Sequence, residues 1–167
     1  MSENNQILVT VLMGSANDHD VLVGCRKALD RFGIAHEAKV LSAHRTPDEL
    51  VEYLGTVEKR GCKIIIAAAG MAAHLGGVVA AHSRLPVLGI PIPAGTLGGM
   101  DALLAISQMP GGVPVATMGI GKAGGKNAAY QCARMLAPFM PEVKERMDAV
   151  LAEDKEKVLK ATLPTEY

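Results

Sequence analysis

The sequence predicts one α/β domain of the doubly wound, flavodoxin-like kind, a three-layer arrangement with helices on both faces of a five-stranded parallel sheet. Short apolar runs alternate with segments of helical periodicity along most of the chain, which favours parallel strands joined by helices. The composition agrees, because 167 residues with 49% hydrophobic and 20% charged side chains are typical of one soluble domain. The whole chain, 1–167, is therefore expected to form a single domain.

Five apolar runs are predicted as strands. The first, "ILVTVLM" at 7–13, is almost continuously apolar, as expected of a parallel strand that is buried on both faces. The others stand at 36–41, 62–69, 87–92 and 113–120. We find no internal repeat, low-complexity segment or linker between them.

Helices are predicted between these strands. Over 20–33 the apolar residues follow helical spacing, and Gly33 marks the end of the helix. Further helices are expected over 47–61, 71–83, 101–109 and 125–138. Together with the strands they make a core of about 7–138.

A charged amphipathic helix is predicted after this core, at about 141–160. It is not needed to complete the sheet, because it follows the fifth strand and that strand's helix. Its apolar stripe either packs on a neighbouring subunit or packs on its own domain. The residues of the stripe are Val143, Met147, Val150, Leu151 and Val158.

Charge and composition argue against several classes of protein. Lys and Arg balance Asp and Glu at 17 each, so no net charge attracts nucleic acid or an acidic membrane. Aromatic residues are only 3% and Trp is absent, which disfavours surfaces that stack bases. The polar start "MSENNQ" has no signal-peptide pattern, and no apolar run is as long as a membrane span. We therefore expect a cytoplasmic protein that binds neither nucleic acid nor membranes.

Three segments rich in polar or small residues follow the first three predicted strands, at 14–18, 42–47 and 69–77. Ligands of open parallel sheets bind outside the carboxyl ends of the strands, so these segments are expected to form three walls of one site. The third wall, "AGMAAHLGG", is small and almost uncharged. It could enclose a small neutral species, or it could simply allow tight packing of helix on sheet.

The first two walls suit an anion. The glycine-rich turn before the first helix offers backbone N–H groups and the hydroxyl of Ser15, and the planar fork of Arg45 matches a phosphate. Asp18 could accept hydrogen bonds from ribose hydroxyls. The alternative is that Asn17 or Asp18 only caps the helix.

His44 is the candidate general acid or base, because it stands among polar residues in the second wall and an imidazole can both donate and accept a proton. His74 and His82 are two other histidines near strand ends. No HxH or HExxH spacing is present, so no metal is expected. Cys25, Cys62 and Cys132 are odd in number and widely spaced, which predicts small buried side chains rather than disulfides or zinc ligands.

Four motifs together resemble the N5-carboxyaminoimidazole ribonucleotide mutase family of purine biosynthesis, the class I PurE proteins. The family's hallmarks are an MGS-x-SD turn, SAHRTP, AGGAAHLPG, and a GVPVAT strand after an SIVQMP helix. Here they read "MGSAND", "SAHRTP", "AGMAAHLGG" and "AISQMPGGVPVAT", in the same order, between about residues 7 and 138.

The resemblance implies an isomerase that needs no cofactor or metal and assembles as a homo-octamer, with its last helix reaching a neighbour. Its substrate is an aminoimidazole ribonucleotide, whose carboxylate moves from the exocyclic nitrogen to ring carbon C4 by way of trapped carbon dioxide. Matched residue by residue, His44 is catalytic, first as an acid and then as a base. The substrate-binding positions are Ser15, Asn17, Asp18, Ser42, Arg45, Gly70, Ala72, Ala73, His74 and Leu75.

The chain departs from the family pattern at three positions. Asn17 stands where the family has Ser, Met71 where it has Gly, and Gly76 where it has Pro. Met71 adds bulk where the ligand should lie close to the backbone, and Gly76 loosens the loop. None of these changes touches His44 or Arg45.

Two other functions stay open at this stage. One is the related aminoimidazole ribonucleotide carboxylase, which uses free carbon dioxide; that class resembles SAHK and AGRSN where this chain has "SAHR" and "AGMAA". The other is a non-enzymatic module that binds a nucleotide or flavin on the same fold. Flavins usually lie against aromatic side chains, and none of the three walls contains one.

Overall fold

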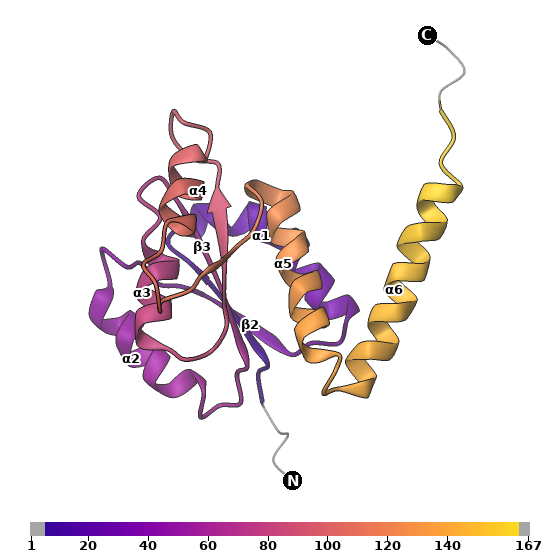
Figure 1. Ribbon diagram of the computed structural model, residues 1–167, viewed down its shortest axis with the longest axis horizontal. Helices are drawn as coiled ribbons and strands as arrows, with labels where there is room; N and C mark the ends of the chain where they lie inside the picture. Colours follow the sequence, from indigo (N-terminus) through magenta and orange to yellow (C-terminus); the bar gives the residue numbers. More distant parts are fainter. Residues whose placement is uncertain (1–5, 164–167) are drawn as a thin grey trace.

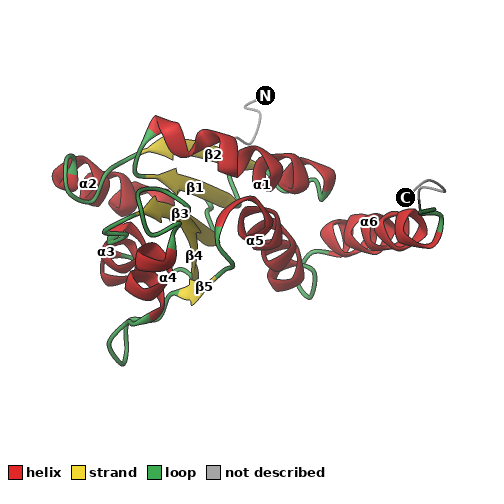
Figure 2. Ribbon diagram, turned by 90° about the horizontal axis from the view of Figure 1, so that it is seen from above, coloured by secondary structure: helices red, strands yellow, loops and turns green. Residues whose placement is uncertain are grey.

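The computed structural model describes residues 6–163 and shows one five-stranded sheet in which every strand pairing is parallel. The strand order is β2-β1-β3-β4-β5, which is that of the flavodoxin-like fold predicted from the sequence (Figures 1 and 2; all five strands are labelled in Figure 2). Residues 1–5 and 164–167 lie outside the described part of the chain, and so does most of the segment expected to lack a signal peptide.

Four strands lie within about two residues of their predicted bounds: β1 (Val9–Met13), β2 (His36–Val40), β3 (Ile64–Gly70) and β4 (Val87–Ile92). The fifth does not, because β5 is only Ala116–Thr117, whereas the sequence predicted a strand over 113–120. The short strand lies at the edge of the sheet and pairs only with β4. Pro114 has no N–H to donate to a neighbouring strand, which limits the pairing on that side.

The helices alternate with the strands as predicted. They are α1 (His19–Arg31), α2 (Pro47–Val57), α3 (Leu75–His82), α4 (Met100–Ser107), α5 (Gly121–Leu136) and α6 (Pro141–Leu159), with one turn of 3₁₀ helix, η1 (Ala16–Asp18), before α1.

Two helices begin away from their predicted positions. Helix α3 starts at Leu75 rather than 71, because residues 71–74 form a turn in which the Ala73 N–H donates to the Met71 carbonyl. Helix α5 starts at Gly121 rather than 125, so Gly121 and Gly124 lie inside the helix instead of before it. A Cβ on Gly124 would overlap the Gly119 carbonyl oxygen at 1.6 Å, so this glycine allows close packing and does not break the helix.

The sheet has a hydrophobic core on each face. Alternate residues of β3 point to opposite faces, Ile64 and Ile66 towards α1 and α5, and Ile65 and Ala67 towards α2, α3 and α4. Figure 2 shows these two groups of helices on opposite sides of the strands. A buried sheet with both faces covered fixes the carboxyl ends of β1 to β4 side by side.

Helix α6 packs against the rest of the chain over part of its length and projects from the core beyond it (Figures 1 and 2). Val143 and Val150 are buried in the same core as α1 and α5, whereas Val158 is 76% exposed. Arg31 donates to Glu153 across 2.8 Å, and the Tyr130 hydroxyl donates to Asp154. The apolar stripe is thus divided between a buried first part and an exposed end.

All three cysteines are buried and unpaired with one another. Burial raises the pKa of the Cys25 thiol to about 12, so this thiol is protonated at neutral pH. The cysteines pack as small apolar side chains, as the sequence predicted. Among residues 6–163 the structure contains no helix both long and apolar enough to cross a membrane.

Candidate active site

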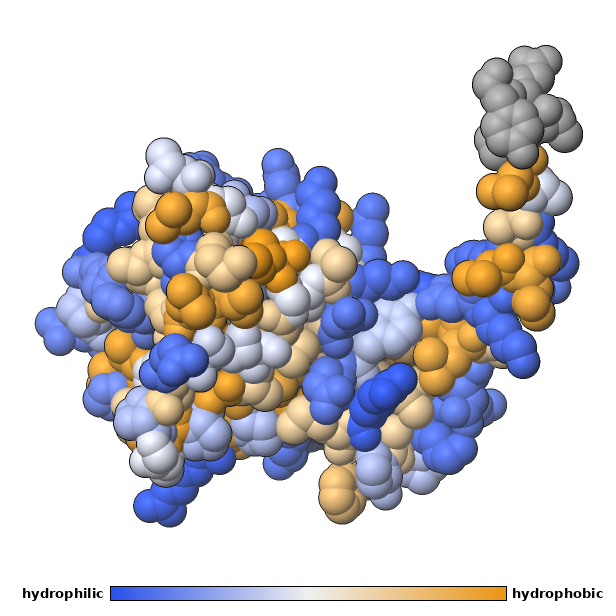
Figure 3. Space-filling model, turned by 45° about the horizontal axis from the view of Figure 1, so that its top comes forward, coloured by the Kyte–Doolittle hydropathy of each residue, from blue (hydrophilic) through white to orange (hydrophobic). Residues whose placement is uncertain are grey.

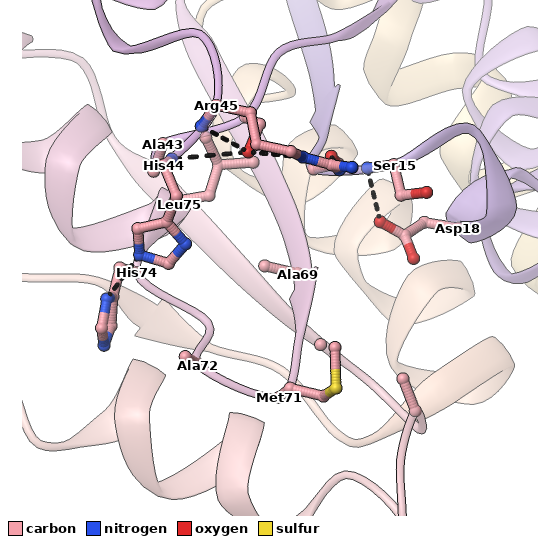
Figure 4. Close-up of a pocket in the computed structure, with 14 residues that line it drawn as sticks. Ser15, Asp18, Ala43, His44, Arg45, Ala69, Met71, Ala72, His74 and Leu75 are labelled. Carbon is pink, nitrogen blue, oxygen red and sulfur yellow. Dashed lines mark hydrogen bonds between the residues drawn. The ribbon is translucent and has the colours of Figure 1, made fainter.

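A pocket of about 460 Å³ opens at the carboxyl ends of β1, β2 and β3, and the loop after β4 contributes to its rim (Figure 4). It contains residues from all three segments that the sequence predicted as walls. The lining residues are Gly14, Ser15, Asp18, Ser42, Ala43, His44, Arg45, Ala69, Gly70, Met71, Ala72, His74, Leu75 and Ala94.

The first wall is a capping box at the start of η1. The Ser15 hydroxyl accepts a hydrogen bond from the Asn17 N–H at 3.2 Å, and the Asp18 carboxylate accepts one from the Ser15 N–H at 3.0 Å. The expected capping role of Asp18 is therefore present, and the same residue also lines the pocket. Because Ser15 Oγ accepts in this box, its own O–H can be donated to a ligand.

Asp18 is a buried carboxylate, with 8% of its surface exposed. Burial raises its pKa, while the Ser15 N–H and the nearby Arg45 act in the opposite direction. An acceptor held in this way suits a ligand hydroxyl better than a ligand anion.

The second wall is a turn held by its own hydroxyl side chains. The Ser42 hydroxyl accepts from the backbone N–H groups of His44 and Arg45 at 3.4 and 3.2 Å. The Thr46 hydroxyl accepts from the Ser42 N–H at 2.8 Å and donates to the Ser42 carbonyl at 3.2 Å. Ser42 and Thr46 thus fix the backbone from which His44 and Arg45 project.

Arg45 joins the second wall to the first. Its Nη2 donates to the Gly14 carbonyl at 2.7 Å, and its Nε lies 3.5 Å from Ser42 Oγ. The guanidinium is therefore held beside the Ser15 turn, although the residue is exposed (Figure 4). A phosphate bound there would meet the Ser15 hydroxyl and the fork of Arg45 together.

His44 lies directly beside His74 in the pocket, with 2.8 Å between His44 Nε2 and His74 Nδ1 and the two rings nearly perpendicular. One of these nitrogens donates and the other accepts, so the pair has two arrangements of its shared proton. When His44 Nε2 accepts, a neutral His44 carries its proton on Nδ1; when Nε2 donates, Nδ1 becomes an acceptor. The contact therefore links the tautomer of His44 to that of His74.

The third wall is the end of β3 and the turn before α3. It presents small side chains and backbone, and its only titratable group is His74. At Gly70 an added Cβ would lie 2.9 Å from the Ala94 Cβ and 3.2 Å from the Ile92 carbonyl, so a larger residue does not fit there. The wall thus combines close backbone approach with an apolar surface.

The structure brings most of the predicted site residues into this one pocket. Asn17 and Ala73 are the exceptions: Asn17 is exposed beside a separate hollow near Met13, and Ala73 is 1% exposed in the core behind the third wall. His82 lies at the end of α3 beside another hollow, away from the pocket.

Four lining residues were not among the site residues predicted from the sequence: Gly14, Ala43, Ala69 and Ala94. Three of them adjoin residues that were named. Ala94 comes from the loop after β4, which was not counted as a wall. The rule that ligands bind at strand ends could have found it, because β4 pairs with β3 as far as Gly70 and Ile92.

The described residues, 6–163, contain no group of three His, Cys, Asp or Glu side chains placed to hold a metal ion. The titratable groups lining the pocket are Asp18, His44, Arg45 and His74. What this arrangement offers is an anion-binding corner, a hydroxyl acceptor, a paired histidine and an uncharged wall.

Known proteins resemble this chain over most of its length. The model of the AIR carboxylase family matches residues 8–157. An N5-carboxyaminoimidazole ribonucleotide mutase of Bacillus subtilis is 46% identical over 157 residues, which cover 94% of this chain and 97% of that protein. The mutase of Pseudomonas aeruginosa is 50% identical over 152 residues, covering 91% and 93%.

A solved structure is similar over nearly the same length. The crystal structure of Treponema denticola PurE superimposes with a TM-score of 0.82 and 26% identity, covering 92% of this chain and 94% of that one. The family match and the identity to the relatives extend over nearly the whole chain, with the pocket inside the matched region. The chain belongs to the AIR carboxylase family.

Proposed function

We propose that this protein is an N5-carboxyaminoimidazole ribonucleotide mutase, an isomerase of de novo purine biosynthesis. The observation that carries the proposal is the pocket, in which His44 lies between an anion-binding corner and an uncharged wall. The family membership and the name shared by the relatives from Bacillus subtilis and Pseudomonas aeruginosa support the same reaction.

In this proposal the phosphate of the substrate binds between Ser15 and Arg45. Arg45 is held beside Ser15 by its hydrogen bond to the Gly14 carbonyl, so little reorganisation is needed to receive a phosphate. The Asp18 carboxylate accepts a hydrogen bond from a ribose hydroxyl. The base and its carboxylate then lie against Gly70, Ala72 and His74, with Leu75 behind them.

His44 carries one proton in and one proton out. As an acid it protonates the exocyclic nitrogen; the bond from that nitrogen to the carboxylate carbon breaks, its electrons stay on nitrogen, and neutral carbon dioxide is released. Ring carbon C4 then attacks the carbon dioxide, forming the new carbon–carbon bond and a carboxylate. His44, now a base, removes the C4 proton, so protons and charge balance over the cycle.

The third wall keeps the intermediate in place. Carbon dioxide is neutral and small, so a wall without charges neither repels it nor offers it water. Gly70 and Ala72 let the backbone of this wall lie close to the pocket, because neither has a large side chain. Retention of carbon dioxide by this wall is what distinguishes an intramolecular transfer from capture of carbon dioxide from solution.

We also propose that the protein works as a homo-oligomer in the cytoplasm, with an octamer as the expected assembly. Figure 3 shows apolar side chains gathered on one face of the α/β core and again towards the end of α6. Leu97 is 63% exposed, Leu104 53% and Val158 76%, and exposed apolar side chains that gather on a surface are typical of protein–protein contacts. Light scattering at micromolar concentration tests this, and a mass of 17.5 kDa would contradict it.

The experiment on the reaction compares initial rates on two ribonucleotides, with bicarbonate varied from none to saturating. We expect the N-carboxylated ribonucleotide to be converted without bicarbonate, and the uncarboxylated one to be used poorly. Faster use of the uncarboxylated substrate with bicarbonate would make the protein a carboxylase instead. A His44→Asn variant is the control, since it separates enzymatic conversion from spontaneous loss of carbon dioxide.

A further inference from the structure

Met71 holds a backbone conformation that is unusual for a residue with a side chain. Its φ is +52°, and it is the only non-glycine residue with positive φ among residues 6–163. In that region the Cβ crowds the following carbonyl, so a side chain stays there only where its surroundings impose it. The N–H of Ala73 donates to the Met71 carbonyl at 2.8 Å, and that of His74 to the Ala72 carbonyl at 2.9 Å, which fixes the turn.

The side chain of Met71 is not in the hydrophobic core. It is 57% exposed and lines the pocket. A Cβ placed on Gly95 would lie 3.3 Å from Met71 Cγ and 3.5 Å from its Sδ, so the thioether lies against the loop after β4. Figure 4 shows the side chain at the edge of the pocket that is away from Arg45. Met71 therefore connects two rims of the pocket, the turn after β3 and the loop after β4.

Packing within the subunit does not explain why the strain is kept, because more than half of the side chain is exposed. A thioether is flexible, uncharged and a weak hydrogen-bond acceptor, so it adds apolar surface and little polar affinity. Its neighbours at this edge, Gly70, Ala72 and Ala94, are too small to cover a ligand by themselves. Met71 has the only long flexible apolar side chain among the described residues that line the pocket.

We propose that Met71 determines how well the pocket retains carbon dioxide: its side chain covers the reacting end of the ribonucleotide and limits exchange of released carbon dioxide with solvent. This inference rests on the proposed mutase function and deepens it. It predicts that Met71 affects the fate of the intermediate more than the binding of the phosphate, which lies at the other side of the pocket beside Ser15 and Arg45.

The test follows labelled bicarbonate into the product during conversion of unlabelled N-carboxylated ribonucleotide, together with release of the uncarboxylated ribonucleotide. Met71→Ala removes the side chain beyond Cβ and keeps a Cβ at positive φ. Met71→Gly removes the whole side chain, including the Cβ. One missing methylene in an apolar pocket typically changes discrimination by about 10-fold or more, so we expect both variants to raise label incorporation and release roughly tenfold. Val51→Ala, which shortens a side chain 40% exposed on α2, is the control and should change neither.

The outcomes separate the two proposals. Unchanged label and release in both Met71 variants, with normal turnover, would overturn the role of Met71 and leave the mutase reaction standing. Leakage in Met71→Gly alone would also overturn it, because that result assigns retention to the stiffness of the turn. A protein that fails to convert the N-carboxylated substrate at all would overturn the proposed function, and this inference with it. Thermal unfolding of the two variants tests whether the backbone is strained at residue 71. Met71→Gly should be at least as stable as Met71→Ala, because glycine adopts a positive φ without strain.

Discussion

Thr46 offers a test of whether the turn after β2 must be held for the site to work. Its hydroxyl makes two hydrogen bonds to Ser42, accepting from the N–H at 2.8 Å and donating to the carbonyl at 3.2 Å. Replacing Thr46 by Ala removes both hydrogen bonds and leaves the backbone bond from the Thr46 N–H to the Ser42 carbonyl at 3.0 Å. His44 and Arg45 lie between the two residues, so the change acts on them without altering either side chain.

The expected magnitudes follow from these contacts. The Ser42 N–H loses its side-chain partner at a half-buried position, while the Ser42 carbonyl keeps one, so the free energy of unfolding should fall by about 1–2 kcal/mol. For a chain of this length such a loss lowers the melting temperature by about 2–6 °C. A small displacement of a positioned catalytic group can reduce rates by up to about 100-fold, so we expect kcat/KM to fall by roughly 10- to 100-fold.

The assay measures kcat/KM for the N-carboxylated ribonucleotide beside the melting temperature. Thr46→Ser restores the hydroxyl and should recover most of both. Thr56→Ala is the matched control, because the Thr56 hydroxyl also donates to a backbone carbonyl, that of Tyr53 at 2.8 Å, on an exposed part of α2. If Thr46→Ala is destabilised as expected and keeps full kcat/KM, the hydrogen bonds of the Thr46 hydroxyl are not needed to position His44 and Arg45.

Three further changes have defined outcomes. His44→Asn should leave the circular dichroism spectrum unchanged and lower kcat by about 10²–10⁴, because the residue transfers the proton in both half-reactions; a variant with most of its activity would move that role to His74. Arg45→Lys keeps the charge and loses the planar fork, so KM should rise roughly tenfold with kcat little changed. Glu37→Gln tests the stability of the protein in acid. The hydrogen bond from Arg60 lowers the pKa of Glu37 in the folded protein. The ionised Glu37 therefore stabilises the fold fully above the pKa of an unfolded glutamate, about 4.3, and this stabilisation is lost as the pH falls through the lower pKa of the folded state. Urea unfolding should therefore show a deficit in this variant at pH 7 that shrinks below about pH 4.

The fold was predictable because its main elements are encoded locally. "IIIAAA" of β3 is apolar at every position, which only a strand covered on both faces requires, and the structure buries it completely. The bounds were wrong where a local signal was ambiguous. The helix predicted to begin at 125 begins at Gly121, and Gly124, which the prediction left outside it, allows close packing inside the helix. The length of β5 depended on pairing with β4, which no run of apolar residues can specify.

Part of the candidate site was also predictable from the sequence. The rule that parallel strands present their carboxyl ends together was enough to place Ser15, His44 and Arg45 in one pocket. The identity of the polar residues indicated what each could do. It did not indicate that Ser42 and Thr46 hold the turn, because a hydroxyl in a loop is equally suited to bind a ligand or the backbone.

The sequence by itself determined the alternation of strands and helices, the buried runs, and the types of residue at the strand ends, since these depend on periodicity and chemistry within a few neighbouring positions. Only the tertiary structure decided the 2.8 Å contact between His44 and His74, the bond from Arg45 to the Gly14 carbonyl, and the positive φ of Met71. The two contacts join residues about 30 positions apart in the chain, and the φ is imposed by a turn held between β3 and α3. Such features arise when packed elements fix the distances and angles between them, and a linear pattern does not contain that information.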